Sequence, residues 1–327
     1  MTATLIEGKP VAEELRERIA AEAETLAMEG KPLRLVAVQV GENPASRLYT
    51  NMQQRQAESC GIEYELRTLY PGISQSGLEG ELGRLNEDPT VTGVILQMPV
   101  PPQIDARAAS ASIAPEKDVE SIHPQNIGKL FYGTWRVAPC TAMAVLELLH
   151  RHCEEMAGKE AVIVGHSEIV GKPLGAMLLA SRDRSPTVTV CHVATRDLAA
   201  HTRQADILIV AAGVSQSKWL AHSRRSADED LPAPDLSPLI SADMIRPGAV
   251  VVDVAINRIP IGFDSAGDPL RNEHGKVQMK TVGDVDFAAA KEVAAAITPV
   301  PGGVGPLTVA KLLQNVLSCA RMQQNEV

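Results

Sequence analysis

The fold of this chain is decided by the stretch Ala161-Val-Ile-Val-Gly165-His-Ser-Glu-Ile-Val-Gly171-Lys-Pro173. Its apolar start predicts a buried strand of a parallel sheet, and Gly165 permits a tight turn at the end of that strand. Gly171 lets backbone or a ligand approach closely, and Pro173 suits the first turn of a helix. A helix that begins directly after such a turn offers free N–H groups to a phosphate. The stretch therefore indicates a nucleotide-binding turn, although its glycine spacing is not the strict Gly-x-Gly-x-x-Gly.

Three more apolar runs follow this turn, at residues 187–191, 207–211 and 249–254. Each is rich in Val or Ile, as expected for strands that are covered on both faces of a sheet. Together with the first strand they predict a Rossmann-type parallel sheet over residues 146–306, with the nucleotide at the carboxyl ends of its strands.

The sequence before residue 146 alternates between helical and strand periodicity. Helices are expected at residues 9–30, 45–59, 76–86 and 141–153, and strands at 33–40, 63–69 and 93–96. Strands joined by helices of this length pair in parallel through crossovers. We therefore predict an α/β fold of two lobes with a cleft between them, in which an N-terminal substrate lobe, residues 1–145, is completed by a C-terminal helix within residues 307–327. The regular pattern fades between Asp105 and Pro139, which favours loops there.

One segment, residues 215–240, does not fit a compact lobe because it is rich in Ser, Pro and charged residues. Its length without periodicity predicts an excursion on the surface of the second lobe. Two interpretations stay open: a tolerated insertion, which we favour, and a functional lid.

The composition bounds the class of protein. The chain has 327 residues, 45% of them hydrophobic, which is enough for two lobes with separate cores. Its net charge of −9 argues against a nucleic-acid surface, because phosphate binding needs clustered Lys and Arg. The five cysteines lie far apart and none has CxxC or CxxH spacing, so neither a disulfide framework nor a metal site is expected. The sequence shows no signal pattern and no apolar stretch of about 20 residues, which predicts a cytoplasmic protein without membrane contact.

Several motifs in a fixed order are more specific than the composition. Gly41-Glu-Asn-Pro-Ala-Ser46 comes shortly before Tyr49, Ile95-Leu-Gln97-Met-Pro ends a strand, and Pro139-Cys-Thr141 precedes a helix. Near the end lie Gly283-Asp-Val-Asp286-Phe and Thr298-Pro-Val-Pro-Gly-Gly-Val-Gly-Pro-Leu-Thr308. In the order and spacing of these motifs the chain resembles the methylenetetrahydrofolate dehydrogenase/cyclohydrolase family over nearly its whole length.

The resemblance implies an oxidoreductase that transfers a hydride from 5,10-methylenetetrahydrofolate to NAD or NADP, with the folate in the cleft between the lobes. It also implies a homodimer. The implied substrate-binding residues are Ser46, Tyr49, Glu120, Pro301, Gly302 and Gly303, and the implied catalytic residues are Gln53 and Gln97. The implied cofactor-binding residues are Thr141, Gly165, His166, Ser167, Gly171, His192, Ala212, Gly213 and Ile256.

Two folate-facing positions depart from the family pattern. Family members usually have Tyr-x-x-x-Lys, whose lysine moves the proton in cyclohydrolysis, but the residue four after Tyr49 is Gln53. An amide forms hydrogen bonds and cannot act as a general base. The usual Asp-Val-Asp-Gly is Asp118-Val-Glu120-Ser121, in which Glu120 keeps a carboxylate for the amidine edge of a pterin but moves it by one methylene. We therefore expect cyclohydrolase activity to be weak or absent.

The cofactor end also departs from the family pattern. Many members read the 2′-phosphate of NADP with an Arg in a Gly-Arg-Ser turn and with Ser or basic residues after the second strand. This chain has His166 and Val193-Ala194 at those positions, and Arg196 is the only cation in the second stretch. A histidine is mostly neutral at pH 7 and valine has no donor, so NAD is slightly favoured over NADP.

Two alternatives to a methylenetetrahydrofolate dehydrogenase stay open. A non-catalytic folate- or nucleotide-binding paralogue would also lose the lysine and alter the aspartate. A dehydrogenase that acts on a related one-carbon carrier would keep the dinucleotide turn and change the folate-facing residues. Binding of both dinucleotides, followed by a folate absorbance assay, separates the three.

Overall fold

The structure is a computed structural model that describes residues 2–42, 44–181, 183–223, 233–265 and 267–324. The chain forms two compact units. Unit 1 contains Met1–Lys9 and Val145–Gly305, and unit 2 contains Pro10–Ala144 and Pro306–Val327. Each unit is α/β with a parallel sheet, so the predicted fold class is confirmed. None of the helices in the described ranges is long and apolar enough to cross a membrane.

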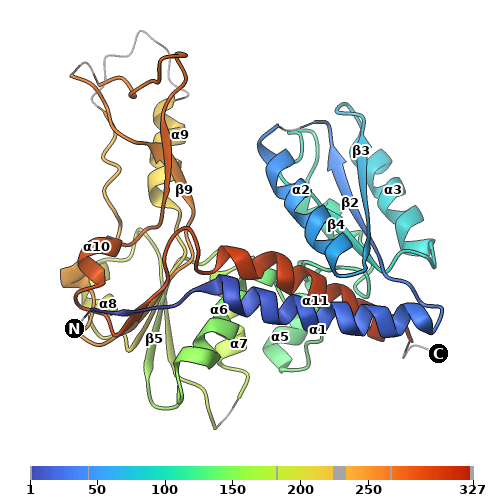
Figure 1. Cartoon of the computed structure of the whole chain (residues 1–327), viewed down its shortest axis with the longest axis horizontal. Helices are drawn as coiled ribbons and strands as arrows, with labels where there is room; N and C mark the ends of the chain where they lie inside the picture. The colour runs from blue at the N-terminus through green and yellow to red at the C-terminus, as the bar shows by residue number, and fades with distance from the viewer. Residues whose placement is uncertain (1, 43, 182, 224–232, 266, 325–327) are drawn as a thin grey trace. The chain divides into compact units, whose positions relative to one another are not determined.

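Unit 1 is built on a six-stranded parallel sheet (Figure 1). Its strands are, in sheet order, β1 (Thr4–Leu5), β11 (Ala296–Ile297), β8 (Val250–Asp253), β7 (Ile207–Val210), β5 (Glu160–Val164) and β6 (Thr187–Cys191). Strands β5, β7 and β8 consist mostly of buried aliphatic residues, as expected for strands covered on both faces. The four strands predicted for this lobe are confirmed.

The order of the strands in unit 1 creates a place for a ligand. The helices of this unit are α7 (Gly171–Leu178), α8 (Leu198–Thr202), α9 (Val214–Ser223) and α10 (Phe287–Ala290), with a short 3-10 helix at Ala242–Met244; α6 (Cys140–His152) leads into it. Strand β5 lies between β6 and β7, so the chain moves to one side of β5 and then back to the other. In open α/β sheets, ligands bind at the carboxyl ends of the strands where the order reverses in this way.

The N-terminus belongs to unit 1, which differs from the predicted lobe of residues 1–145. Strand β1 pairs in parallel with β11, with Thr4 opposite Ala296 and Leu5 opposite Ile297. The Ile6 N–H extends this pairing by donating to the Ile297 carbonyl at 2.9 Å. A strand of two residues has no periodicity that a sequence can show, so the pairing could not be predicted.

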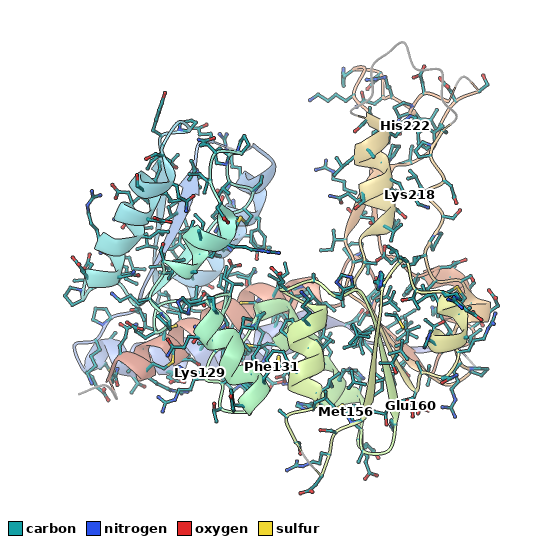
Figure 2. The ribbon with its side chains drawn as sticks, turned by 180° about the vertical axis from the view of Figure 1, so that it is seen from behind. Lys129, Phe131, Met156, Glu160, Lys218 and His222 are labelled. Atoms are coloured by element: carbon teal, nitrogen blue, oxygen red, sulfur yellow. The ribbon has the colours of Figure 1, made fainter. Side chains whose placement is uncertain are left out.

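Two inserted segments of unit 1 pack together. Helix α9 runs alongside β9 (Asn257–Pro260), which pairs with the antiparallel strand β10 (Met279–Val282), as Figure 1 shows. We call α9 together with residues 257–282 the arm. Trp219 of α9 lies against Phe263, with ring centroids 6.1 Å apart. Figure 2 labels Lys218 and His222 on the same helix.

The arm corrects the prediction for residues 215–240. We expected a segment without regular structure, but α9 occupies its first part, and residues 224–232 lie outside the described ranges. The helix has few apolar residues, so no apolar stripe marked it in the sequence. Hydrogen bonds attach it to β9: the Gln216 N–H donates to Asn257 Oδ1 at 2.9 Å, and the Arg258 N–H donates to Gln216 Oε1 at 2.8 Å.

Unit 2 has a three-stranded parallel sheet in the order β3 (Glu63–Leu69), β2 (Arg34–Val40), β4 (Gly93–Leu96). Its helices are α1 (Gly8–Met28), α2 (Pro44–Ser59), α3 (Gln75–Glu87), α4 (Ala106–Ala111), α5 (Pro124–Tyr132) and α11 (Gly305–Gln324), of which α1 and α11 each begin in unit 1. Leucines of α3 pack against valines of β2 and β4 in its core. The strands and the long helices predicted here are confirmed.

Helices α4 and α5 lie where the sequence indicated loops. Helix α4 begins after Asp105, whose carboxylate accepts from the Arg107 N–H at 2.9 Å. Helix α5 has Pro124 at its start and ends at Gly133, which takes the left-handed conformation with φ of 69°. Both helices are shorter than three turns, so each has too few residues for its apolar periodicity to stand out in the sequence, and capping residues mark their ends.

Helix α11 lies beside α1 in unit 2 (Figure 1), where Arg321 of α11 pairs with Glu22 of α1. Asn315 attaches the same helix to two loops, because its Nδ2 donates to the carbonyls of Val119 and Ala138 at 2.7 and 2.8 Å. These bonds hold the last helix against the loop that carries Glu120.

Candidate active site

The turn between β5 and α7 has no room for side chains at two of its glycines. Gly165 has φ of 124°, and a Cβ atom there would lie 2.4 Å from the Ala211 carbonyl oxygen. A Cβ atom on Gly171 would lie 1.9 Å from the Gly165 carbonyl oxygen. The turn after β5 therefore touches the turn after β7 where the strand order reverses, and close backbone approach requires both glycines.

The N-terminus of α7 (Gly171–Leu178) directly follows this turn, where the Lys172 N–H donates to the Ser167 carbonyl at 3.1 Å and Pro173 has no N–H. Its capping residue, Val170, forms no side-chain cap hydrogen bond, and its own N–H donates to the Ser167 hydroxyl at 3.1 Å. His166 and Ser167 are exposed. A glycine turn that opens into a helix N-terminus is the arrangement that binds the pyrophosphate of a dinucleotide. The predicted cofactor residues Gly165, His166, Ser167 and Gly171 all lie in this turn.

His192 follows β6 and lies next to His166. Their ring centroids are 4.8 Å apart, and the rings are nearly perpendicular at 76°. His192 Nδ1 accepts from the Ala194 N–H at 3.2 Å, which assigns the proton of the neutral ring to Nε2. Val193 is 61% exposed and has no donor side chain. Arg196 lies in the turn before α8 and not within that helix.

The turn after β7 contains two predicted cofactor residues, Ala212 and Gly213. Their N–H groups donate to Asp284 Oδ2 at 2.9 and 2.7 Å. Ile256, after β8, is 60% exposed. The predicted residues that follow β5, β6, β7 and β8 thus share the carboxyl edge of one sheet. Thr141, the remaining predicted cofactor residue, lies in the first turn of α6, in unit 2.

Pro301, Gly302 and Gly303 were predicted to contact substrate, and they form a tight turn in unit 1. The Gly303 N–H donates to the Pro299 carbonyl at 2.8 Å. Gly302 has φ of 120°, and a Cβ atom on Gly303 would lie 2.6 Å from Thr298 Cβ. The turn presents backbone and proline rings, so it can position a ligand but cannot move a proton.

Three elements of unit 2 bring polar side chains into one buried cluster. Gln53 of α2 is fully buried, Gln97 follows β4, and Tyr64 lies on β3. Gln53 Oε1 accepts from Gln97 Nε2 at 2.8 Å and from the Tyr64 hydroxyl at 3.1 Å. Both lone pairs of that oxygen are therefore used. Ser46, predicted to bind substrate, lies in the first turn of α2, and its side chain is outside the described part of the structure.

The amide nitrogen of Gln53 is poorly satisfied. Gln53 Nε2 is buried and has no hydrogen bond of good geometry with any described residue, although the Gln53 side chain lies close enough to Tyr49 to lower the pKa of its hydroxyl. Turning this amide alone would place its nitrogen against Gln97 Nε2, where two donors would meet, whereas turning both amides would let Gln53 Nε2 donate to Gln97 Oε1 and to the Tyr64 hydroxyl. A buried donor without an acceptor costs about 1–3 kcal/mol, so the orientation of the two amides affects the stability of this cluster. In either orientation the position supplies no titratable group.

Tyr49 lies one turn before Gln53 on α2 and is 40% exposed. Burial of its hydroxyl, and then electrostatic repulsion from Cys140 and Glu120, raise the pKa of Tyr49 to about 12. The neighbouring side chains of Gln53 and Thr308 lower this pKa by less. The phenol therefore stays protonated at neutral pH, and its ring is available to stack on a flat ligand.

The loop that carries Glu120 is held at both ends. Asp118 accepts from the His123 N–H at 2.8 Å. Ser121 has φ of 55°, a left-handed conformation at the position where the family has glycine, and its hydroxyl donates to the Val137 carbonyl at 3.1 Å. A left-handed residue other than glycine costs about 1–2 kcal/mol, and this hydrogen bond offsets part of that cost.

Glu120 lies on this loop, near enough to Tyr49 and Cys140 to act on both electrostatically. Burial, and then the neighbouring charge of Asp118, raise the pKa of Glu120 to about 7. Its own charge adds to the burial that raises the pKa of Tyr49 and of the Cys140 thiol. A carboxyl group with a pKa near neutrality changes its charge within the range of working pH, so Glu120 can gain or lose a proton there.

Three residues that interact with predicted site residues or with the loop of Glu120 were not predicted: Tyr64 bonds Gln53, Thr308 interacts with Tyr49, and Asn315 donates to the Val119 carbonyl. Tyr64 lies within the period-two pattern of β3, and a buried tyrosine hydroxyl needs a partner, which is a signal that could have found it. Thr308 and Asn315 lie two turns apart on one face of α11. The sequence predicted that helix but not the side chains that it meets.

Comparisons with known protein families match this arrangement. The model of the tetrahydrofolate dehydrogenase/cyclohydrolase catalytic domain matches residues 6–120, and the model of its NAD(P)-binding domain matches residues 139–221 and 215–324. The chain belongs to the tetrahydrofolate dehydrogenase/cyclohydrolase family. The resemblance read from the sequence motifs is thereby confirmed.

Relatives in this family match over their full length. A bifunctional FolD protein of Syntrophus aciditrophicus is 41% identical, over 98% of this chain and 99% of the relative. The structure of the bifunctional methylenetetrahydrofolate dehydrogenase/cyclohydrolase of Campylobacter jejuni is 36% identical, with a TM-score of 0.82 over 98% of this chain and 99% of that chain. The Trypanosoma brucei enzyme, complexed with NADP and an inhibitor, is 32% identical, with a TM-score of 0.81 over 99% of both chains. The likeness thus extends over both domains of the family.

Proposed function

We propose that this chain transfers a hydride from 5,10-methylenetetrahydrofolate to NAD or NADP, giving 5,10-methenyltetrahydrofolate, and that it hydrolyses the methenyl product weakly or not at all. The observation that carries the proposal is the buried Gln53, which stands where the family has its proton-moving lysine. From the family alone we also infer a homodimer that works in the cytoplasm.

Hydride transfer needs no titrating group on this chain. The bound dinucleotide supplies the hydride acceptor, and the carbon that gives up the hydride loses no proton in the same step. Catalysis then depends on holding the donor carbon close to the acceptor, for which orientation alone can supply a large rate increase. The exposed ring of Tyr49 can stack on the folate and help to hold it.

Hydrolysis of the methenyl product makes a different demand. Water must add to the methenyl carbon and a proton must leave, which calls for a base near that carbon. Gln53 cannot take a proton, and Tyr49 with a pKa of about 12 is already protonated. Glu120 titrates near neutrality, but on this proposal its carboxylate is engaged by the pterin.

A direct assay of both reactions tests this function. With each dinucleotide, the rise in absorbance of the methenyl product measures its formation. The fall in the same absorbance, starting from the methenyl compound, measures its hydrolysis. Oxidation with hydrolysis near the buffer rate supports the proposal. Dinucleotide binding without turnover of the folate would favour a related one-carbon carrier. Absence of both reactions with either cofactor would favour a non-catalytic binding protein.

We expect kcat/KM to be higher with NAD than with NADP, because His166 and Val193 stand where phosphate readers are expected. His166→Arg should raise kcat/KM for NADP by about 10- to 100-fold, since a charge-assisted pair with the 2′-phosphate contributes about 1.5–3 kcal/mol. The value for NAD should change little. Steady-state kinetics near neutral pH with both cofactors make the measurement.

The control for this prediction is Arg196→Gln, in the turn before α8. If the unaltered protein instead prefers NADP strongly and Arg196→Gln removes the preference, Arg196 reads the phosphate and the assignment of His166 is wrong.

Glu120 should make folate binding depend on pH. Its carboxyl is neutral below its pKa of about 7 and ionised above it, and only the ionised form accepts two hydrogen bonds from a pterin amidine edge. We therefore expect KM for the folate to fall by roughly tenfold between pH 6 and pH 8, as the ionised fraction rises from about one tenth to about nine tenths. Glu120→Gln should flatten this profile, whereas Glu116→Gln, earlier on the same loop, should retain it. A flat profile in the unaltered protein would contradict the role of Glu120.

A further inference from the structure

Asp284, buried in unit 1, collects four hydrogen bonds on one carboxylate. Its Oδ2 accepts from the N–H groups of Ala212 and Gly213 at 2.9 and 2.7 Å. Its Oδ1 accepts from the Val214 N–H at 3.2 Å and from Asn257 Nδ2 at 2.9 Å. The Asp284 side chain thus binds three successive N–H groups between β7 and α9, although these groups lie 70 residues or more before it in the sequence.

The backbone that carries Asp284 is fixed in its turn. Asp253, the last residue of β8, accepts from the N–H groups of Asp284 and Val285 at 3.2 and 2.9 Å. A Cβ atom on Gly283 would lie 1.8 Å from Asp253 Oδ2, so only glycine fits beside that carboxylate. The Asp253 N–H donates to the Thr298 hydroxyl at 2.8 Å. Asp284 therefore cannot move away from the turn without disturbing β8.

The turn that Asp284 holds lies beside the nucleotide-binding turn. The Ala211 carbonyl faces Gly165 so closely that a Cβ atom there would approach it to 2.4 Å. The position of a Cβ on Gly213, whose φ is 64°, has no atom of the described residues within 4 Å apart from its two chain neighbours, and so faces open space. Because Asp284 uses the N–H groups of residues 212–214, the turn offers a dinucleotide this bare surface and not free donors.

We propose that Asp284 is a positioning residue for the dinucleotide, which acts by binding the turn 212–214 so that Gly213 borders the space that the dinucleotide fills. The proposal rests on the proposed function for the place of the cofactor. Asp286 is the matched control, because it belongs to the same Gly-Asp-Val-Asp run but caps α10, where it accepts from the Ala289 N–H at 3.3 Å.

Asp284→Asn keeps the size of the side chain and removes its charge and one acceptor oxygen. We expect Kd for NAD and for NADP, measured by calorimetry, to rise by about 10- to 100-fold, because a displaced turn misplaces the cofactor. KM for the folate and kcat at saturating dinucleotide should change by less than about threefold, a split that a general loss of stability would not produce. Asp286→Asn should leave all three quantities within about twofold.

Hydrogen exchange on the unaltered protein gives a second test that does not depend on a variant folding. The N–H groups of residues 212–214 should be protected in the free protein and change little when NAD is added. Rapid exchange that NAD then suppresses would overturn the proposal, as would an Asp284→Asn protein that binds dinucleotide as well as Asp286→Asn does. If the unaltered protein binds neither dinucleotide, the proposed function itself fails, which is a distinct result.

Discussion

Gly171→Ala should abolish the binding of NAD and NADP, whereas Gly175→Ala, one turn further along α7, should bind both within about twofold of the unaltered protein. A methyl group on Gly171 would lie 1.9 Å from the Gly165 carbonyl oxygen. To relieve this clash, the backbone at Gly171 and the backbone at Gly165 would have to move apart, which would open the turn. The same group on Gly175 meets only side-chain atoms, the nearest at 3.8 Å, which is ordinary contact. Displacing the turn by about 1 Å should cost 100-fold or more in affinity, and calorimetry measures it.

The comparison of the two alanine variants separates binding from folding. Circular dichroism and thermal unfolding should show both proteins folded, with Gly171→Ala the less stable. Folate binding by Gly171→Ala should persist, because the polar cluster around Gln53 lies in unit 2. Unchanged dinucleotide affinity in a folded Gly171→Ala protein would mean that this turn does not bind the pyrophosphate.

The fold was predictable where local chemistry and burial agree. The strands of unit 1 are short apolar runs, and such runs fit only a sheet covered on both faces, so β5, β7 and β8 were found within a residue or two. The long helices of unit 2 carry clear apolar periodicity, and α1, α2 and α11 were found for that reason. Glycine and proline then marked where the turns begin.

Other elements depend on partners that are distant in sequence. Strand β1 has two residues and exists because β11 pairs with it. Helix α9 is polar along most of its length and is held by Asn257 and by the contact of Trp219 with Phe263, neither of which a local pattern reveals. The antiparallel strands β9 and β10 were likewise not predicted, since an inserted hairpin packs on a helix and not on the main core.

The candidate site divides in the same way. Motif order pointed to Gln53, Gln97, Glu120 and the glycines of the turns, because each stands at a position that the family motifs define. The hydrogen-bond network could not be predicted from the sequence. Tyr64 and Gln97 both donate to one oxygen of Gln53 because tertiary packing brings them together. Asp284 shows the limit most clearly, because its motif was found while its role in binding a turn 70 residues away was not.

Gln53→Lys should restore hydrolysis of methenyltetrahydrofolate, which the unaltered protein should carry out barely above the buffer rate. A general acid–base group typically contributes about 10²- to 10⁴-fold, so the gain should be plain in a direct assay. Gln97 can turn its amide oxygen toward the new ammonium, and the Tyr64 hydroxyl can accept from it, so the buried position can hold the charge. The gain should stay below that range if Glu120 pairs with the lysine and keeps its proton.

The control is Gln54→Lys, which adds the same charge one residue along α2 on an exposed face, where Gln54 now donates to Glu58 at 2.8 Å. It should leave both reactions unchanged, because its ammonium points away from Gln97 and Tyr64. Dehydrogenase activity should survive in Gln53→Lys, since hydride transfer depends on orientation and not on a proton at this position.

If the unaltered protein already hydrolyses the methenyl substrate efficiently, another residue moves the proton. Glu120, with its pKa of about 7, would then be the first to replace, and loss of hydrolysis in Glu120→Gln would identify it.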